Sequence, residues 1–134
     1  MAFDFGGKRV GIAVSDPLKI IANSLETVDT SKVYDFIKNY LQNENVEVFV
    51  VGFPYNHGHQ HSNEIVEKIH VFINKLSQLY PSIPVKKIDE RFTSKMASQA
   101  MIMGGMNKKD RQNKGNLDKI SATIILQTYM EMNQ

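Results

Sequence analysis

The sequence predicts an α/β protein in which helices pack against a mixed five-stranded sheet. Short strand-like segments separated by turn residues fill the first 28 residues, and from residue 30 onward helical periodicity alternates with short apolar runs. Strands that follow one another directly pair antiparallel, whereas strands separated by a helix can pair parallel. The expected order is therefore three strands, a helix, a strand, a helix, a strand and two helices, all in one domain of residues 1–134.

Three of the strands are expected near the amino terminus. The first ends with Phe3-Asp4-Phe5, and the Gly6-Gly7 link after it makes a hairpin to a second strand at residues 10–15 plausible. Residues 20–28 are a weaker candidate for the third strand, which polar residues 29–31 close.

The remaining elements alternate between helix and strand. Thr30 or Ser31 can cap the first helix, which is expected to run to about Glu44. Three consecutive apolar residues, 49–51, are typical of a strand that is covered on both faces. The other expected elements are strands at 46–52 and 85–89 and helices at about 63–80, 93–104 and 117–132.

The composition limits the classes of protein that the chain can belong to. The absence of cysteine excludes disulfides and thiolate metal sites. The chain has no apolar run long enough to span a membrane and no secretory leader, so we expect a cytoplasmic protein. Residues 84–119 carry 9 Lys/Arg against 4 Asp/Glu, whereas residues 1–83 carry 7 against 9. Such a basic segment can face a polyanion, or it can be a lysine-rich surface loop.

Three groups of acidic residues lie where a metal could bind. Asp4 interrupts an apolar strand, Asp89 and Glu90 end an expected parallel strand, and Asp118 begins the last helix with Ala122 one turn further on. Converging carboxylates repel each other unless a cation binds, and oxygen ligands favour magnesium or manganese. Each acid also has an ordinary explanation as a turn cap, a helix-terminus charge or an ion pair. The spacing alone therefore indicates only a candidate carboxylate metal site.

Four motifs in order give the chain a resemblance to a known family. They are Asp4 to Asp16 (DFGGKRVGIAVSD), Val50 to Pro54 (VVGFP), Asp89 to Ser94 (DERFTS), and Asp118 followed by Ser121-Ala122 and Ile124 to Leu126. The sequence resembles the Holliday-junction-resolvase-like proteins of the YqgF type, a family described as nucleases of pre-16S ribosomal RNA. The strand before Asp4 is shorter than expected for this family, so we expect either a start further upstream or a short strand.

The resemblance implies a ribonuclease H-like fold and hydrolysis of phosphodiester bonds. It places Mg²⁺ or Mn²⁺ on Asp4, Glu90 and Asp118 as catalytic metal ligands, and Asp89 ranks below Glu90 because it alternates to the other strand face. The basic residues that would contact nucleic acid are Lys8, Arg9, Arg91, Lys108, Lys109, Arg111 and Lys114.

The resemblance implies structured RNA as the substrate, most simply in 5′-end maturation of 16S ribosomal RNA. A resolvase of DNA junctions and a nucleic-acid-binding factor with an idle site are the alternatives. A resolvase would act as a homodimer, and the sequence leaves monomer and homodimer open. His57, His59 and His61 alternate in one loop and could bind zinc or nickel, but an exposed polar loop is the favoured interpretation.

Overall fold

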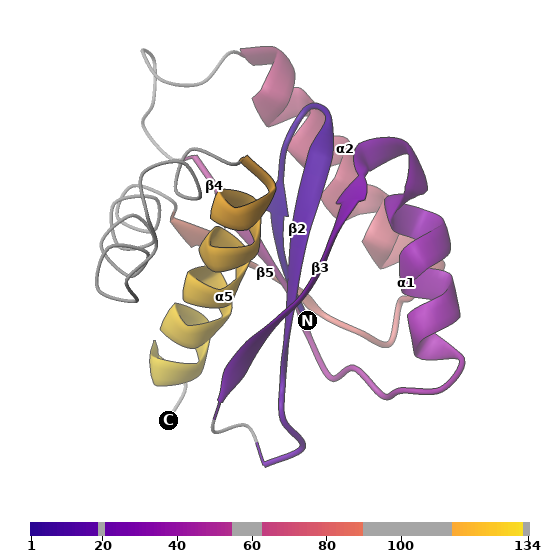
Figure 1. Ribbon diagram of the computed structural model, residues 1–134. Coiled ribbons are helices and arrows are strands. Elements are labelled where there is room, and N and C mark those ends of the chain that lie inside the picture. Colours follow the sequence, from indigo (N-terminus) through magenta and orange to yellow (C-terminus); the bar gives the residue numbers. More distant parts are fainter. Residues whose placement is uncertain (19–20, 55–62, 90–113, 133–134) are drawn as a thin grey trace.

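The computed structural model describes residues 1–18, 21–54, 63–89 and 114–132, and of Asn63 and residues 114–119 it describes the backbone alone. In chain order the elements are β1 (Ala2–Phe5), β2 (Arg9–Ser15), β3 (Ala22–Asp29), the 3-10 turn η1 (Thr30–Lys32), α1 (Val33–Leu41), β4 (Phe49–Phe53), α2 (Asn63–Leu79), β5 (Val85–Asp89) and α5 (Lys114–Met132) (Figure 1). The helix expected at residues 93–104 lies outside the described residues.

The strands form one mixed sheet, as the sequence predicts. Their order across the sheet is β3-β2-β1-β4-β5, with β1 in the centre. β1 pairs antiparallel with β2, and β2 with β3, whereas β1, β4 and β5 run parallel to one another. Leu25 has no partner in β2, because Ile12 pairs with Glu26 and Ala13 with Ser24, so β3 carries a one-residue bulge.

Helices cover both faces of the sheet. α1 and α2 lie on one face and α5 on the other (Figure 1). Under α1 and α2, Phe72 packs against Phe3 and Phe5, with ring centroids 5.2 and 4.8 Å apart. On the other face, Ala122 and Ile125 of α5 pack against a different set of strand side chains. Alternate residues of each strand therefore enter different cores, which explains why β4 is buried at every position.

Several boundaries differ from the sequence prediction. The N-cap positions fall on Asp29 for η1 and on Lys32 for α1, neither with a side-chain cap, rather than on Thr30 or Ser31. The Thr30 hydroxyl donates to the Gly6 carbonyl at 2.9 Å. α1 ends at Leu41 rather than Glu44, and residues 42–44 form a turn in which their amides bond back to Asn39 and Tyr40. β4 begins at Phe49, where pairing with its neighbours begins, and α5 begins at Lys114, three residues earlier than expected.

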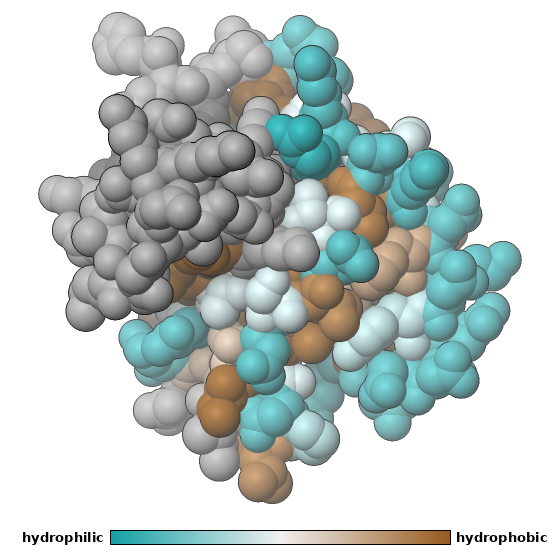
Figure 2. Space-filling view, viewed as in Figure 1, coloured by the Kyte–Doolittle hydropathy of each residue, from teal (hydrophilic) through white to brown (hydrophobic). Residues whose placement is uncertain are grey.

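The surface around these elements is mainly polar. Figure 2 shows hydrophilic side chains over the part of the molecule that holds α1 and α2, with smaller hydrophobic areas between them. No helix in the described ranges is both long enough and apolar enough to cross a membrane.

Candidate acidic site at the sheet edge

The candidate site lies where the three parallel strands end. Because β1, β4 and β5 run in the same direction, their carboxyl ends meet at one edge of the sheet. The β1–β2 hairpin and the start of α5 lie at the same end of the molecule (Figure 1). Ligands of open α/β sheets bind at such an edge, so Asp4, near the end of β1, is placed to contact a ligand.

Asp4 faces the α5 side of the sheet. Its neighbours Phe3 and Phe5 are buried in the core under α1 and α2, whereas Ala2 is buried in the core under α5. Side chains alternate along a strand, so Asp4 shares the face of Ala2. Asp4 is half-buried and already has an interaction with its surroundings. A carboxylate at the central strand of a sheet is costly to desolvate unless polar or cationic groups compensate for it.

Glycines flank Asp4 on both neighbouring strands. Asp4 pairs with Gly11 of β2. Phe3 pairs with Val51 of β4. The next residues along these two parallel strands, Asp4 and Gly52, therefore also lie side by side. Glycine within a strand often marks a place where a ligand or another backbone approaches closely. We call Gly11, Asp4 and Gly52 the glycine strip, and it leaves the carboxylate without side chains beside it on either strand.

Two basic residues follow Asp4 in the hairpin. Arg9 lies on the α5 face, because Val10 is buried in the opposite core and the next residue, Gly11, pairs with Asp4. Arg9 is therefore a diagonal neighbour of Asp4, within reach of a long side chain. Lys8 is exposed in the turn, and its carbonyl accepts a hydrogen bond of 2.9 Å from the Thr30 amide. The structure thus places Arg9 diagonally across from Asp4 and Lys8 in the adjoining turn, and the contacts of both residues with phosphate remain a prediction.

The other predicted site residues are only partly described. Asp118 lies in α5, one turn before Ala122 and two turns before Ile125, and both of these are fully buried in the core on the face of Asp4. Asp89 lies on the opposite face, because Ile88 belongs to the core under α5. The residues Glu90, Arg91, Lys108, Lys109 and Arg111 lie outside the described residues, and of Lys114 only the backbone at the start of α5 is described.

Metal binding by Asp4, Glu90 and Asp118 therefore remains a prediction. Among the described side chains, no three His, Cys, Asp or Glu residues come together as a metal-binding group. Glu90 and the carboxylate of Asp118 do not belong to that set, so this finding does not test the trio. His57, His59 and His61 also lie outside the described residues.

Two features of this edge were missed from the sequence. The first is the glycine strip, although a single glycine inside each of two strand patterns was a visible signal for it. The second is Thr30, which binds both ends of the hairpin turn through its amide and its hydroxyl. No local pattern signals the second feature, because Thr30 and Gly6 are 24 residues apart.

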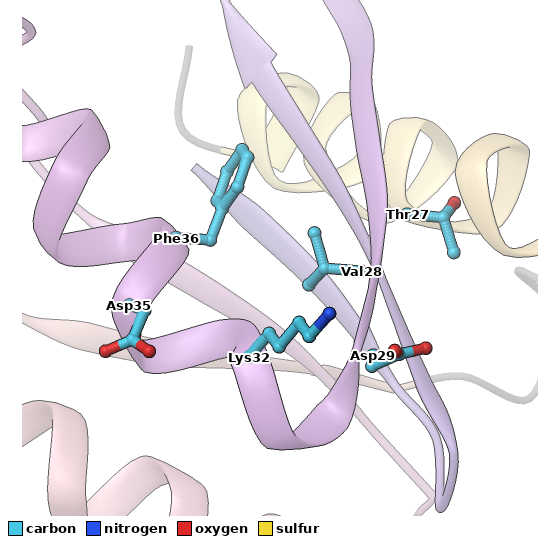
Figure 3. A pocket seen from close by; sticks show the side chains of 6 residues that line it. All are labelled: Thr27, Val28, Asp29, Lys32, Asp35 and Phe36. Atoms are coloured by element: carbon cyan, nitrogen blue, oxygen red, sulfur yellow. The ribbon is translucent and has the colours of Figure 1, made fainter.

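A shallow hollow between β3 and α1 is separate from this edge. It has a volume of about 500 Å³ and is lined by Thr27, Val28, Asp29, Lys32, Asp35 and Phe36 (Figure 3). Val28 packs against the core under α1 and α2, so the hollow lies mainly on the face opposite Asp4. Its charged residues, Lys32 with two aspartates, do not form an anion site.

The strand order, the helices on both faces and the acid on the central strand define a class of protein, the ribonuclease H-like α/β proteins. A family model described as RuvX, Holliday junction resolvase, matches residues 1–132, and the chain belongs to this family.

Curated relatives align with nearly the whole chain. A protein of Phocaeicola vulgatus is 53% identical over 131 residues, which are 98% of this chain and 94% of the relative. A protein of Bacteroides fragilis is 49% identical over 134 residues, with the same coverage, and one of Flavobacterium johnsoniae is 46% identical over 130 residues, 97% of this chain and 94% of the relative. Each is named "Putative pre-16S rRNA nuclease". Family and relatives together make this chain a nuclease, a hydrolase of nucleic acid.

Proposed function

We propose that this chain is a divalent-metal-dependent nuclease that cleaves structured RNA in the 5′-end maturation of 16S ribosomal RNA in the cytoplasm. The observation that carries the proposal is the half-buried Asp4 on the glycine strip, at the carboxyl edge of the parallel strands. The names of the relatives supply the substrate class.

The donor chemistry at this edge fits magnesium or manganese. Asp4 offers carboxylate oxygens, which are the ligands that these hard cations prefer. Gly11 and Gly52 add no side chains on either side of it, so the neighbouring strands place no side chain in the way of an ion that binds Asp4. Asp4, Glu90 and Asp118 would hold the ions, which when bound make a water molecule more acidic and stabilise the leaving oxygen of a phosphodiester.

The basic residues would position the substrate backbone. Arg9 shares the face of Asp4, and its guanidinium can bind a phosphate through two parallel hydrogen bonds. Lys8 adds a charge at the exposed turn, which Thr30 anchors. Lys108, Lys109, Arg111 and Lys114 would form a further basic rim, and Arg91 would contact phosphate or orient a carboxylate. Contacts of this kind hold the backbone without reading the base sequence.

A resolvase of four-way DNA junctions is the second candidate, because the matching family carries that description. The same acids and metals would cleave a DNA phosphodiester, so the site chemistry does not separate the two functions. A junction has two-fold symmetry, and a resolvase should therefore act as a homodimer.

Cleavage by the Asp4→Asn variant tests the proposal. We expect this variant to cleave pre-16S RNA at least about a hundredfold more slowly than the parent in manganese, with RNA affinity retained, because one oxygen ligand is replaced by a neutral amide. Asp35→Asn, at an exposed position of α1, is the control and should cleave at the parent rate. Full activity of Asp4→Asn would refute the site.

A parallel cleavage assay on the parent protein distinguishes between the RNA and the DNA substrate. RNA cleavage at the mature 5′ end, with no cleavage of a four-way DNA junction, supports RNA maturation. The reverse result, together with a dimer in solution, supports the resolvase. Binding without cleavage under every divalent ion would leave a nucleic-acid-binding factor with an idle site.

A further inference from the structure

Two basic side chains rest on one aromatic ring at the same sheet edge, outside the acidic site. The ring is that of Phe53, the last residue of β4, and the basic residues are Lys87 of β5 and His70 of α2. We call these three residues the Phe53 patch. It faces the α2 side of the sheet, because Phe53 is buried in the core under α1 and α2.

The contacts hold both basic groups close to the ring. The Lys87 ammonium nitrogen lies 4.8 Å from the centroid of the Phe53 ring, which is a cation–π distance. The His70 and Phe53 ring centroids are 4.9 Å apart, with the planes tilted by 59°. Phe53 itself is 7% exposed, whereas Lys87 and His70 are exposed. The patch therefore presents polar hydrogen-bond donors to solvent on a buried aromatic base.

This arrangement lowers the entropy cost of binding an anion. A free lysine side chain loses rotamer freedom when a ligand fixes it. The cation–π contact of the Lys87 ammonium with the Phe53 ring already restricts this side chain, which stays exposed to solvent. A phosphate that binds there orders little further.

Among the described residues, acids near the patch come from β5 and α2. Asp89 lies on the same face as Lys87, half-buried and already engaged in an interaction of its own. On α2, Glu67 is exposed one turn before His70, and Glu64 pairs with Lys68 at 3.1 Å. Asp89, which pairs with Phe53, and Glu67 are therefore the described acids that reduce the positive potential of the patch, and the Lys87 ammonium is the charge that the patch offers to an anion.

The patch lies close to the acidic site along the edge. Phe53 follows Gly52, which lies beside Asp4 on the neighbouring strand, and Lys87 is on the strand after that. Asp4 and Lys87 are two strands apart but lie on opposite faces of the sheet, so a nucleic-acid strand would pass around the carboxyl ends of the strands to contact both.

We propose that the Phe53 patch binds the phosphate backbone of the substrate strand as it leaves the acidic site on the α2 side. Lys87 supplies the charge, His70 donates a hydrogen bond, and Phe53 holds both groups in place. The proposal rests on the nuclease function, and it predicts binding that is independent of base sequence. If Lys87 merely covers the Phe53 ring, its charge will not affect nucleic-acid affinity.

The test compares two lysines that have the same kind of contact. Lys75 of α2 also places its ammonium over an aromatic ring, 4.3 Å from the centroid of Tyr34, and it lies more than one helical turn beyond His70. Lys87→Gln and Lys75→Gln each remove one charge and keep most of the stem. Fluorescence anisotropy would measure their affinity for a labelled RNA hairpin with single-stranded tails, in EDTA and over a range of salt concentrations.

We expect Lys87→Gln to weaken binding about threefold at low salt and to reduce the slope of log affinity against log salt by about 0.7 to 0.9, the loss of one phosphate contact. Lys75→Gln should bind like the parent, and Lys87→Arg should restore the parent slope. If Lys87→Gln and the parent have equal slopes, the Phe53 patch does not bind phosphate. This conclusion holds even if the variant has a lower melting temperature. If the parent cleaves RNA and both glutamine variants bind RNA equally, only the proposed role of the patch is wrong. If the parent binds neither RNA nor DNA, the nuclease function is wrong as well.

Discussion

At the scale of single residues, the turn beside the acidic site depends on Gly6. A Cβ atom added at Gly6 would lie 2.7 Å from the carbonyl oxygen of Arg9, closer than such contacts allow. The same oxygen accepts the Gly6 amide at 2.9 Å, so it cannot move away without losing that hydrogen bond. We expect Gly6→Ala to lower the free energy of unfolding by about 1–3 kcal/mol, measured by urea denaturation.

Gly7→Ala is the matched control in the same turn. A Cβ atom at Gly7 would meet nothing within 4 Å. Removing a glycine there restricts the unfolded chain, so the variant should be as stable as the parent or up to about 1 kcal/mol more stable. Equal losses for both variants would mean that the turn is strained by alanine in general and that the Arg9 contact is unimportant.

The acid of the site could be found from the sequence, but its surroundings could not. Asp4 stands between two phenylalanines in a strand pattern, which is an unusual place for a carboxylate. The contact between Lys87 and Phe53 depends on the register of β4 against β5, in which Phe53 pairs with Asp89. A one-residue shift would move every side chain to the other face, and no local pattern fixes that register.

At the scale of elements, Thr30 joins the end of β3 to the β1–β2 hairpin. Its amide donates to Lys8 and its hydroxyl to Gly6, both at 2.9 Å. Thr30→Val keeps the shape but leaves the Gly6 carbonyl without that donor, so we expect a loss of about 1 kcal/mol in the free energy of unfolding. Hydrogen exchange should also be faster at the amide of residue 30, because the turn opens more often.

Thr30→Ser separates the hydrogen bond from the side-chain volume. Serine keeps the hydroxyl, so most of the stability and the slow exchange should be retained. If Thr30→Val is as stable as the parent and exchanges at the same rate, the hydroxyl does not anchor the hairpin.

The same residue explains why one element boundary was mispredicted. Threonine or serine before a helical periodicity is a good capping signal, and the sequence therefore predicted a cap at Thr30 or Ser31. In the folded chain the Thr30 hydroxyl donates a hydrogen bond to the distant Gly6 carbonyl. β4 likewise begins at Phe49 rather than Val46, because its pairing with β5 begins there, opposite Val85. Helix and strand types follow from local periodicity, whereas their ends follow from tertiary partners.

At the scale of the whole molecule, the sheet separates two cores and so decides which residues can meet. The change from antiparallel to parallel pairing was predictable, because adjacent strands are joined first by short turns and later by helices. The position of β1 in the centre was not predictable from periodicity, since it depends on which neighbours β1 pairs with. That position places Asp4 on the face that α5 covers, where Asp118 also lies on the helix.

A convergence of Asp4, Glu90 and Asp118 would link metal binding to the stability of the entire fold, because the acids come from β1, from the residue after β5 and from α5. Magnesium or manganese should then raise the melting temperature of the parent, since a ligand at a hundred times its Kd adds about 2.7 kcal/mol to the native state. Asp4→Asn should lose most of this rise in a differential scanning measurement. It should also melt no lower than the parent without metal, because one of three repelling charges is gone. Asp35→Asn should respond to metal like the parent. If Asp4→Asn keeps the full response and a variant with alanine at His57, His59 and His61 loses it, the ions bind at the histidines rather than at the sheet edge.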